Sequence, residues 1–318
     1  MKKFIIEIVF FFFLPLSIIA VVAEYSLRNI PNDYAYKSSW MDNNSRNIEV
    51  LYLGPSTIFY DLDPAISKWK GFNASHVSQP LIYDHFIFNK YLDKMDSLKY
   101  VVLGVDYWSP RGTMKGTTEW WRMKYYTIHY DCPYDKDKTK YSYELYFHNP
   151  ETMTIAAKGT LRLLGLNNVS HLTVNEYGYG TNYTSDKRAE EWDNGQEEGK
   201  RHNILISSAY QSDDIYHQNI DFIKDISKKC KDRGVKLILL GSPHYISYNN
   251  TIERKFIDDR DLFCESLASS HDNVYFINYS ELNLFSADEY YDAMHLNEHG
   301  SRRFTELIDK ELDNLSTR

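Results

Sequence analysis

Two short loops carry the residue types that nucleophilic catalysis needs. In the loop Gly54-Pro55-Ser56-Thr57 a serine hydroxyl follows an apolar run and could attack an acyl carbon. The loop from Asp292 to Asn297 contains Asp292 and His295, three residues apart. A carboxylate at that spacing can fix the imidazole tautomer and leave the second ring nitrogen free as a base. Because turns with serine and surface histidines are both common, each loop alone is a weak signal, and the prediction depends on the fold bringing them together.

Short apolar runs rich in β-branched residues predict the strands that would position these loops. Nearly continuous runs of this length suit strands buried on both faces of a parallel sheet. The four strong runs are Ile48–Gly54, Leu98–Asp106, Val235–Gly241 and Asn273–Tyr279, and Phe72–Val77 is a weaker fifth. We expect a mostly parallel sheet of about five strands, with sites at the carboxyl ends of the strands.

Amphipathic helices are predicted between these runs. Ser212 can cap a helix that ends at Gly234, Asn297 can cap the last helix, and a further apolar stripe lies between them. The inward-facing residues of the three helices are Ile215, Ile223, Ile226 and Cys230; Ile252, Phe256, Phe263 and Leu267; and Phe304, Leu307, Ile308 and Leu312. Strands that alternate with helices predict an α/β domain with right-handed crossovers.

The segment Ser109–Asn203 breaks the alternation and is predicted to be a long aromatic insertion or lid. Trp120-Trp121 within it could stack on a sugar or form the core of the insertion. Arg201-His202 could bind an anionic or acyl group or begin a solvated helix. Ser242-Pro243-His244, directly after the run Val235–Gly241, could reach the carboxyl end of the sheet, where Ser56 is expected, or simply end the strand.

The N-terminus predicts export from the cytoplasm. Lys2 and Lys3 precede an apolar run, Phe4–Ala23, which is long enough to span a bilayer. An uncleaved anchor at 1–23 is favoured, and a signal peptide cut after Ala23 is the alternative. Residues 24–47 look like a polar, irregular stalk, and 48–318 form the α/β domain with its insertion at about 109–203. The domain is thus expected on the periplasmic side of the inner membrane.

Composition excludes several other classes of function. The net charge of −8 argues against both nucleic acid and an anionic membrane surface as main partners. The three cysteines, Cys132, Cys230 and Cys264, are far apart and predict neither a zinc site nor more than one disulfide. The chain has no P-loop, GxGxxG or HExxH motif, so we expect neither a cofactor nor a metal.

The order of the two loops resembles that of the SGNH hydrolase superfamily, from Ile48 to about Leu315 apart from the insertion. Together with the alternation of strands and helices, the resemblance implies a three-layer, flavodoxin-like α/β domain with strand order 2-1-3-4-5. It also implies that Ser56 is the nucleophile, His295 the base and Asp292 the orienting acid. It places Ser78 at the glycine whose N–H serves the oxyanion hole, with Gln79 beside it as a possible side-chain donor. Gly104-Val105-Asp106-Tyr107 stands where the superfamily has Gly-x-Asn-Asp, so Asp106 replaces a donor, and Pro55 is a second departure.

The chain is more closely similar to the membrane-anchored DltD-like and alginate O-acetylation-like branch of that superfamily. The similarity lies in the anchor, Ile30-Pro31-Asn32-Asp33-Tyr34, Asp61-Leu62-Asp63-Pro64 and Phe72-Asn73-Ala74 with Val77-Ser78-Gln79. Thr57 stands where this branch often has His. The resemblance implies an enzyme that moves acyl groups to or from a cell-envelope polymer, beside a multipass membrane O-acyltransferase.

We therefore expect an extracytoplasmic O-acyltransferase or esterase with the triad Ser56, Asp292 and His295. Ser78, Gln79, Asp106 and His244 are the expected oxyanion or substrate-binding residues. The alternative is a non-catalytic, membrane-tethered binding or assembly module on a degenerate SGNH body, which the altered Pro55 and Asp106 motivate. A Ser56–His295 hydrogen bond would favour the enzyme, and a buried or distant Ser56 would favour the module.

Overall fold

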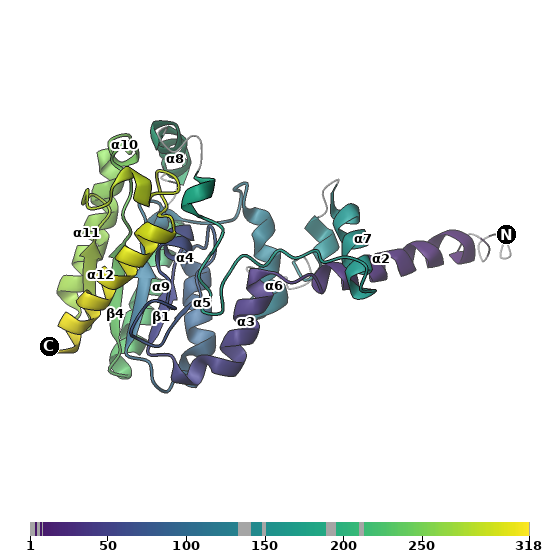
Figure 1. Cartoon of the computed structure of the whole chain (residues 1–318), viewed down its shortest axis with the longest axis horizontal. Helices are drawn as coiled ribbons and strands as arrows, with labels where there is room; N and C mark the ends of the chain where they lie inside the picture. The colour runs from purple at the N-terminus through teal and green to yellow at the C-terminus, as the bar shows by residue number, and fades with distance from the viewer. Residues whose placement is uncertain are drawn as a thin grey trace. The chain divides into compact units, whose positions relative to one another are not determined.

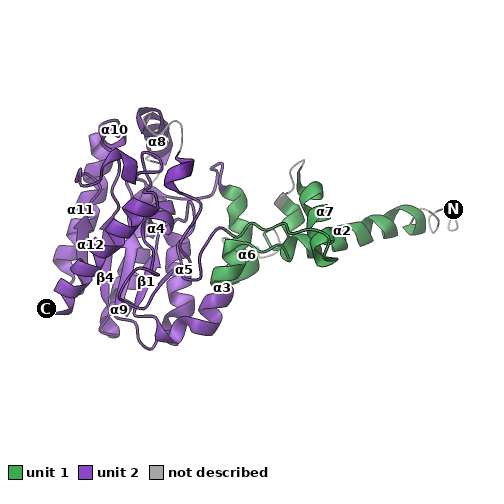
Figure 2. Cartoon of the chain, in the orientation of Figure 1, with its two compact units in different colours: residues 1–38, 120–172 green, residues 39–119, 173–318 purple. Residues whose placement is uncertain are grey.

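The computed structural model describes residues 4, 7, 9–132, 141–147, 151–188, 195–209 and 213–317. The chain divides into two compact units (Figure 2). Unit 1 contains residues 1–38 and 120–172, and unit 2 contains residues 39–119 and 173–318. The predicted insertion is thus divided between the units, and only its middle part leaves unit 2.

Unit 2 is built on a five-stranded parallel sheet (Figure 1). The strands are β1 (Val50–Leu53), β2 (Gly71–Asn73), β3 (Tyr100–Gly104), β4 (Lys236–Gly241) and β5 (Val274–Asn278). Their order across the sheet is β2-β1-β3-β4-β5. This confirms the predicted α/β class and strand order. The weak fifth run was placed slightly late, because β2 begins at Gly71 and ends at Asn73.

Helices cover both faces of the sheet. Alternate residues of a strand point to opposite faces, and Val50, Val102 and Ile238 belong to one buried cluster with α12 (Glu298–Ser316). On the other side, α9 (Asp214–Asp232) packs on β4 and on α5 (Leu81–Tyr91). The remaining helices of unit 2 are α4 (Ser56–Asp61), α8 (Gly195–Ala209), α10 (Ile246–Asn249) and α11 (Arg254–Ser270), and α3 (Asp33–Asn44) runs from unit 1 into unit 2. Short 3₁₀ turns are η2 (Ser45–Asn47), η3 (Leu92–Lys94), η4 (Ser109–Arg111), η5 (Trp120–Arg122), η6 (Glu144–Phe147), η7 (Ser185–Lys187) and η9 (Ala287–Glu289).

Most of the predicted helix ends agree with the structure. The Asn297 side chain accepts hydrogen bonds from the N–H groups of His299 and Gly300, which caps α12 as expected. Gly234, at φ +69°, follows the last turn of α9. The predicted cap Ser212 lies outside the described residues.

Unit 1 contains the apolar N-terminal helix. A π-helical turn, η1 (Val9–Phe13), continues into α2 (Leu14–Arg28), and unit 1 also contains α6 (Met123–Tyr130) and α7 (Thr152–Leu163). Val9–Arg28 is 20 residues long and only 11% buried, so its length and composition suit either a membrane span or a signal sequence.

The prediction of an irregular stalk at residues 24–47 is wrong. The turn at Pro31-Asn32 exists, and Asn32 Oδ1 accepts the N–H of Ala35 at the start of α3. On either side of this turn, however, the chain is helical. Polar residues of α3 such as Lys37 and Ser38 are buried by contacts that are distant in sequence, so hydropathy alone could not reveal the helix.

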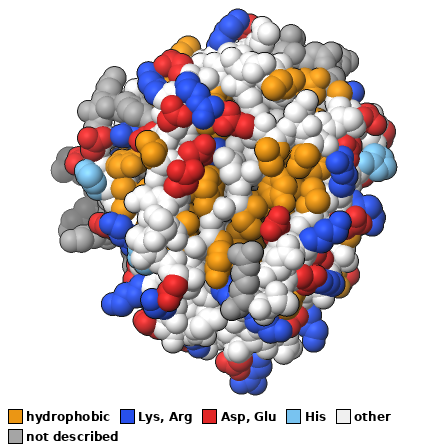
Figure 3. Space-filling model, turned by 90° about the vertical axis from the view of Figure 1, so that its left-hand side faces the viewer, with side chains coloured by type: hydrophobic (Ala, Val, Ile, Leu, Met, Phe, Trp, Pro, Cys, Tyr) orange, Lys and Arg blue, Asp and Glu red, His pale blue; other side chains and the backbone are white. Residues whose placement is uncertain are grey.

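Charges of both signs are interspersed on the face shown in Figure 3, with hydrophobic patches near the centre of that view. The mixture fits the modest net charge of −8. It does not resemble a surface built to attract one highly charged polymer.

Candidate active site

A sharp turn after β1 presents Ser56. Gly54 has φ +135°, and a Cβ there would lie 3.0 Å from the backbone N of Gly104 and 2.8 Å from the Ile58 side chain. Only glycine fits such a turn without strain. Pro55 then caps α4, and Ser56 is the first residue of the helix. The Ser56 N–H therefore has no partner within the helix and can face a ligand.

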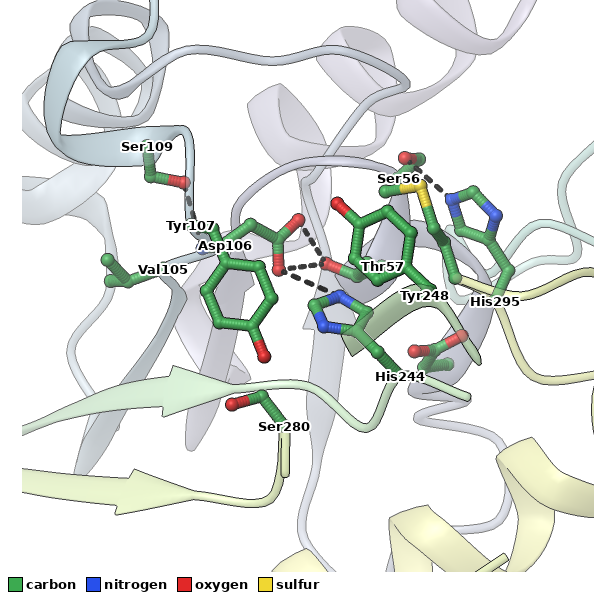
Figure 4. Close-up of polar contacts among 12 residues, drawn as sticks. Ser56, Thr57, Val105, Asp106, Tyr107, Ser109, His244, Tyr248, Ser280 and His295 are labelled. Atoms are coloured by element: carbon green, nitrogen blue, oxygen red, sulfur yellow. Dashed lines mark hydrogen bonds and ion pairs between the residues drawn. The ribbon is translucent and has the colours of Figure 1, made fainter. Parts of the chain in front are cut away.

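Ser56, His295 and Asp292 form a hydrogen-bonded chain (Figure 4 shows Ser56 facing His295). His295 Nε2 lies 2.8 Å from Ser56 Oγ, although the residues are 239 positions apart. His295 Nδ1 lies 2.8 and 3.0 Å from the two carboxylate oxygens of Asp292. Asp292 Oδ1 also accepts the backbone N–H groups of Met294 and His295, which holds the carboxylate against the ring. The three residues predicted as a triad are thus brought together.

The charge of the triad resides on its histidine and aspartate. Burial alone would raise the pKa of Asp292, but the His295 charge and three N–H donors outweigh it and lower that pKa. Burial alone would lower the pKa of His295, but Asp292, followed by Asp61 and Asp106, raises it to about 9. Burial also raises the pKa of Asp61 and Asp106. Asp292 is therefore the carboxylate that carries the charge opposite the imidazolium.

The loop after β2 provides the position predicted to serve the oxyanion. Ser78 has φ +58°, a left-handed conformation that glycine adopts most easily. This fits the expectation that Ser78 occupies a position where related sequences have glycine. The neighbouring Gln79 side chain donates instead to the buried Asp84, with Nε2 2.5 Å from Oδ1. Asp84 also accepts a backbone hydrogen bond from Gly54, so it links the Ser78 loop to the Ser56 turn.

Asp106 lies beside Thr57, the residue after Ser56, in a buried polar cluster (Figure 4). Thr57 Oγ1 lies 3.1 and 3.2 Å from its two oxygens. Ser109 Oγ accepts the Asp106 N–H, which fixes the loop after β3. Burial raises the pKa of Asp106, and the Thr57 hydrogen bond only partly opposes this.

His244, after β4, faces Asp106 but does not form a charged pair with it. His244 Nε2 lies 3.8 Å from Asp106 Oδ1, and neither ring nitrogen has a hydrogen-bond partner among the described residues. Burial, followed by the nearby Arg260 charge, holds the pKa of His244 well below its usual range. A neutral imidazole gives little Coulomb attraction, so the contact is polar rather than ionic.

Three tyrosines lie around the imidazole of His295. Tyr183 stacks between Tyr60 and Tyr291, with ring centroids 3.6 and 3.8 Å away. The rings of Tyr183 and Tyr60 make T-shaped contacts with the His295 ring, with centroid separations of 5.3 and 5.6 Å. Tyr183 comes from the predicted insertion, whose Gly180 N–H bonds to the Phe59 carbonyl of α4. The insertion therefore contributes directly to the surroundings of His295.

Sequence reasoning missed Asp61, Asp84 and Tyr183 as contributors to the site. Asp61 is fully buried and its Oδ1 accepts the Leu296 N–H, which ties α4 to the loop that carries His295. The only sequence signal for Asp61 was its place in Asp61-Leu62-Asp63-Pro64. Tyr183 is one of 27 tyrosines and had no distinguishing pattern.

The weaker sequence candidates are distributed over both units. Arg201 pairs with Glu198 on the exposed face of α8, whereas His202 Nδ1 lies 2.8 Å from the buried Tyr248 hydroxyl. Trp120 and Trp121 belong to unit 1. There they line a cavity of about 640 Å³. The three cysteines are buried and free. Among the described residues, no group of three His, Cys, Asp or Glu side chains is arranged to hold a metal ion.

Comparison with known proteins gives limited matches. A family model without a functional description matches residues 197–317, which is less than half of the chain. No curated protein matches the chain. A solved structure from Streptococcus pneumonia, provisionally described as a platelet activating factor, is similar at 11% identity and a TM-score of 0.41. That match covers 94% of this chain and 97% of the other.

Proposed function

We propose that this protein is an extracytoplasmic acyl-ester enzyme of the SGNH type, of the DltD-like and alginate O-acetylation-like branch. The proposal is supported chiefly by one observation, the hydrogen-bonded chain from Ser56 through His295 to Asp292. Such a chain activates a hydroxyl for attack on an acyl carbon. The left-handed Ser78 and the partly exposed position of Ser56 at the start of α4 add to this support.

In the proposed reaction, Ser56 Oγ attacks the carbonyl carbon of an acyl donor while His295 Nε2 takes the hydroxyl proton. The N–H groups of Ser56 and Ser78 stabilise the oxyanion that forms. Collapse of this intermediate breaks the bond to the leaving group, which receives the proton from His295. The acyl group is then attached to Ser56 as an ester.

A second attack completes the cycle. A hydroxyl of a cell-envelope polysaccharide, or water, loses its proton to His295 and attacks the acyl carbon. The bond between this carbon and Ser56 Oγ then breaks, and Oγ takes the proton back from His295. The first acceptor makes the enzyme an O-acyltransferase and the second an esterase. The tyrosine stack beside His295 supports transfer, because aromatic rings can bind a sugar and exclude water.

The proposed location follows from the apolar helix. Val9–Arg28 is long enough to span the inner membrane, and Lys2 and Lys3 favour a cytoplasmic N-terminus. Unit 2 would then act on the periplasmic side. A multipass membrane O-acyltransferase is the proposed partner that supplies the acyl group.

The alternative of a non-catalytic binding module is less well supported. A buried or distant Ser56 would have favoured it, whereas Ser56 is partly exposed and its Oγ lies 2.8 Å from His295 Nε2. The unusual Asp106 remains its main motivation.

A reactive fluorophosphonate probe tests the proposal directly. Wild-type protein should form an adduct that mass spectrometry places on Ser56, and Ser56→Ala should abolish it. Ser208→Ala, on the exposed part of α8, is the control and should label like wild type. Circular dichroism and thermal unfolding should show that both variants are folded. Absence of labelling in folded wild-type protein, or labelling that survives Ser56→Ala, would point to the binding module.

A further inference from the structure

The end of α7 in unit 1 forms an exposed apolar turn. Leu161, Leu163, Leu164 and Leu166 are all exposed, and we call this group the leucine turn. Leu164 is 68% exposed and Leu166 is 71% exposed. Single exposed leucines need no explanation, but a contiguous group indicates an interaction surface.

The leucine turn has a defined geometry. The N–H of Leu166 bonds to the carbonyl of Leu161 at 2.8 Å, and the N–H of Gly165 bonds to that of Arg162 at 2.9 Å. Gly165 has φ +75°. This pair of hydrogen bonds with a left-handed glycine is the Schellman ending of a helix. The leucines are therefore held outward by backbone structure.

Contacts within unit 1 determine where the turn lies along α2. Ser26 Oγ lies 2.8 Å from Thr160 Oγ1, and Gly159 packs against the carbonyl of Ser26. Beyond the turn the chain returns, and the His171 N–H bonds to the carbonyl of Pro31. Thr152 and Ile155, in the first half of α7, line the same cavity as Ile30 and Asn32. Higher residue numbers in α7 therefore correspond to lower numbers in α2, so the two helices are antiparallel.

This antiparallel packing places the leucine turn beside the apolar helix. At about 1.5 Å per residue, Leu164 lies about 6 Å beyond Thr160, toward the start of α2. That is about the level of Val22, which lies inside the segment Val9–Arg28 that could span a membrane. The small residues at the contact, Ala23, Ser26 and Gly159, let the two helices approach closely.

The charge of α7 also suits a membrane surface. Its residues Thr152–Leu163 include Lys158 and Arg162 but no Asp or Glu. Basic residues flanking exposed leucines are typical of helices that bind the interface of an anionic bilayer.

We propose that the leucine turn inserts into the lipid leaflet at the C-terminal end of the span, as a second membrane contact beside α2. The occupant of this apolar surface is lipid, because the surface continues that of a helix suited to the bilayer. Two contact points would restrain rotation of unit 1 about the axis of α2. The proposal does not depend on the chemistry of Ser56.

Site-directed spin labelling of the full chain tests the insertion. Single cysteines replace Leu164 or Leu166, and the three native cysteines are buried and should not react under native conditions. Leu172→Cys is the control within unit 1, because its neighbour His171 is level with Pro31, beyond the span. Leu262→Cys, on α11 in unit 2, is a second control, because Leu262 is 67% exposed and so matches Leu164 in exposure. Unsubstituted protein reports background labelling.

The labelled proteins are reconstituted at low protein-to-lipid ratio into vesicles of phosphatidylethanolamine and phosphatidylglycerol. Labels at 164 and 166 should collide preferentially with oxygen, which dissolves in acyl chains, and those at 172 and 262 with a water-soluble nickel chelate. The proposal would be overturned if the nickel chelate reached the labels at 164 and 166 as readily as the label at 172. It would also be overturned if protection from nickel disappeared when the protein was diluted in lipid, because the turn would then be covered by a second copy of the chain. Ser56→Ala should not change the result, so this test and that of the proposed function fail independently.

Discussion

The protonation state of His295 decides whether Ser56 can be activated. Its pKa is raised to about 9, chiefly by Asp292 against the opposing effect of burial. A general base must be neutral, so kcat/KM for ester cleavage should rise with pH and level off above about pH 9. The pH dependence of hydrolysis of an activated acetate ester measures this. A flat profile across that range would contradict the role of His295 as base.

Stability should change in the opposite direction over the same range. A raised folded-state pKa means that the folded protein holds the His295 proton more tightly than the unfolded chain. This contribution is complete below the ordinary pKa of 6.5 and is lost as pH rises through about 9. Asp292→Asn should weaken the effect, shift the activity midpoint to lower pH, and reduce kcat by up to about 10⁴-fold.

Asp106 offers a separate test at the residue scale. Because burial raises its pKa and Thr57 already donates to it, Asp106→Asn should keep the Thr57 contact through the amide oxygen. The new amide N–H is the donor that the SGNH pattern has at this position, so kcat should equal or exceed that of wild type.

The matched variant at this position is Asp106→Ala, which removes the acceptor of the buried Thr57 hydroxyl. It should cost about 1–3 kcal/mol of unfolding free energy, measured in urea. If Asp106→Asn destabilised the protein as much as Asp106→Ala, the carboxyl would be required in its charged form and the oxyanion interpretation would fail.

At the scale of elements, the turn between β1 and α4 positions the nucleophile, and Gly54 makes the turn possible. Gly54→Ala combines a disfavoured φ of +135° with a Cβ 3.0 Å from the backbone of Gly104. Gly116 provides the control, because its φ is +80° but a Cβ there would meet nothing within 4 Å. Gly116→Ala should cost about 1 kcal/mol, from backbone strain alone.

Gly54→Ala should cost clearly more and should also reduce fluorophosphonate labelling of the folded fraction, because the close contact displaces Ser56. Chemical denaturation compares the two variants. Equal losses in stability with unchanged labelling would show that the turn can relax without moving the nucleophile.

The returning part of the insertion, with Tyr183, is the second element that shapes the site. Tyr183→Ala removes a ring stacked between Tyr60 and Tyr291 and should lower kcat by about 10-fold, a typical effect of a small misplacement of His295. Tyr183→Phe keeps the stack and should behave like wild type. Steady-state kinetics with both variants separates ring packing from the hydroxyl. Loss of activity in Tyr183→Phe alone would instead assign the role to the hydroxyl.

Across the whole molecule, the sequence predicted what depends on local patterns. The apolar runs that became β1, β3, β4 and β5 were evident because strands buried on both faces are continuously hydrophobic. The triad of Ser56, His295 and Asp292 was predicted because the order of their two loops resembles that of the SGNH superfamily, and the structure brings these three side chains together. By contrast, the buried carboxyls of Asp61 and Asp84 find their partners only in the folded structure. The same holds for α3, where burial of Lys37 and Ser38 outweighs their polarity.

The last prediction concerns the N-terminus, which the sequence left open between an anchor and a cleaved signal. In the structure α2 runs without interruption through Ala23 to Arg28, and Ala23 and Ser26 are buried within unit 1. Cleavage after Ala23 would leave only Glu24–Arg28 of α2 to pack against α7, too few residues for a stable helix on their own. Glu24 would also become the first residue of the chain, whereas in the structure it lies within α2 and its carboxylate accepts the N–H groups of Glu144 and Leu145. We therefore expect the mature protein to retain the apolar helix and to resist extraction from membranes by alkaline carbonate. Intact-mass measurement of protein purified from membranes decides the question, and a mature chain that begins at Glu24 in the soluble fraction would refute both the anchor and the proposed insertion of the leucine turn.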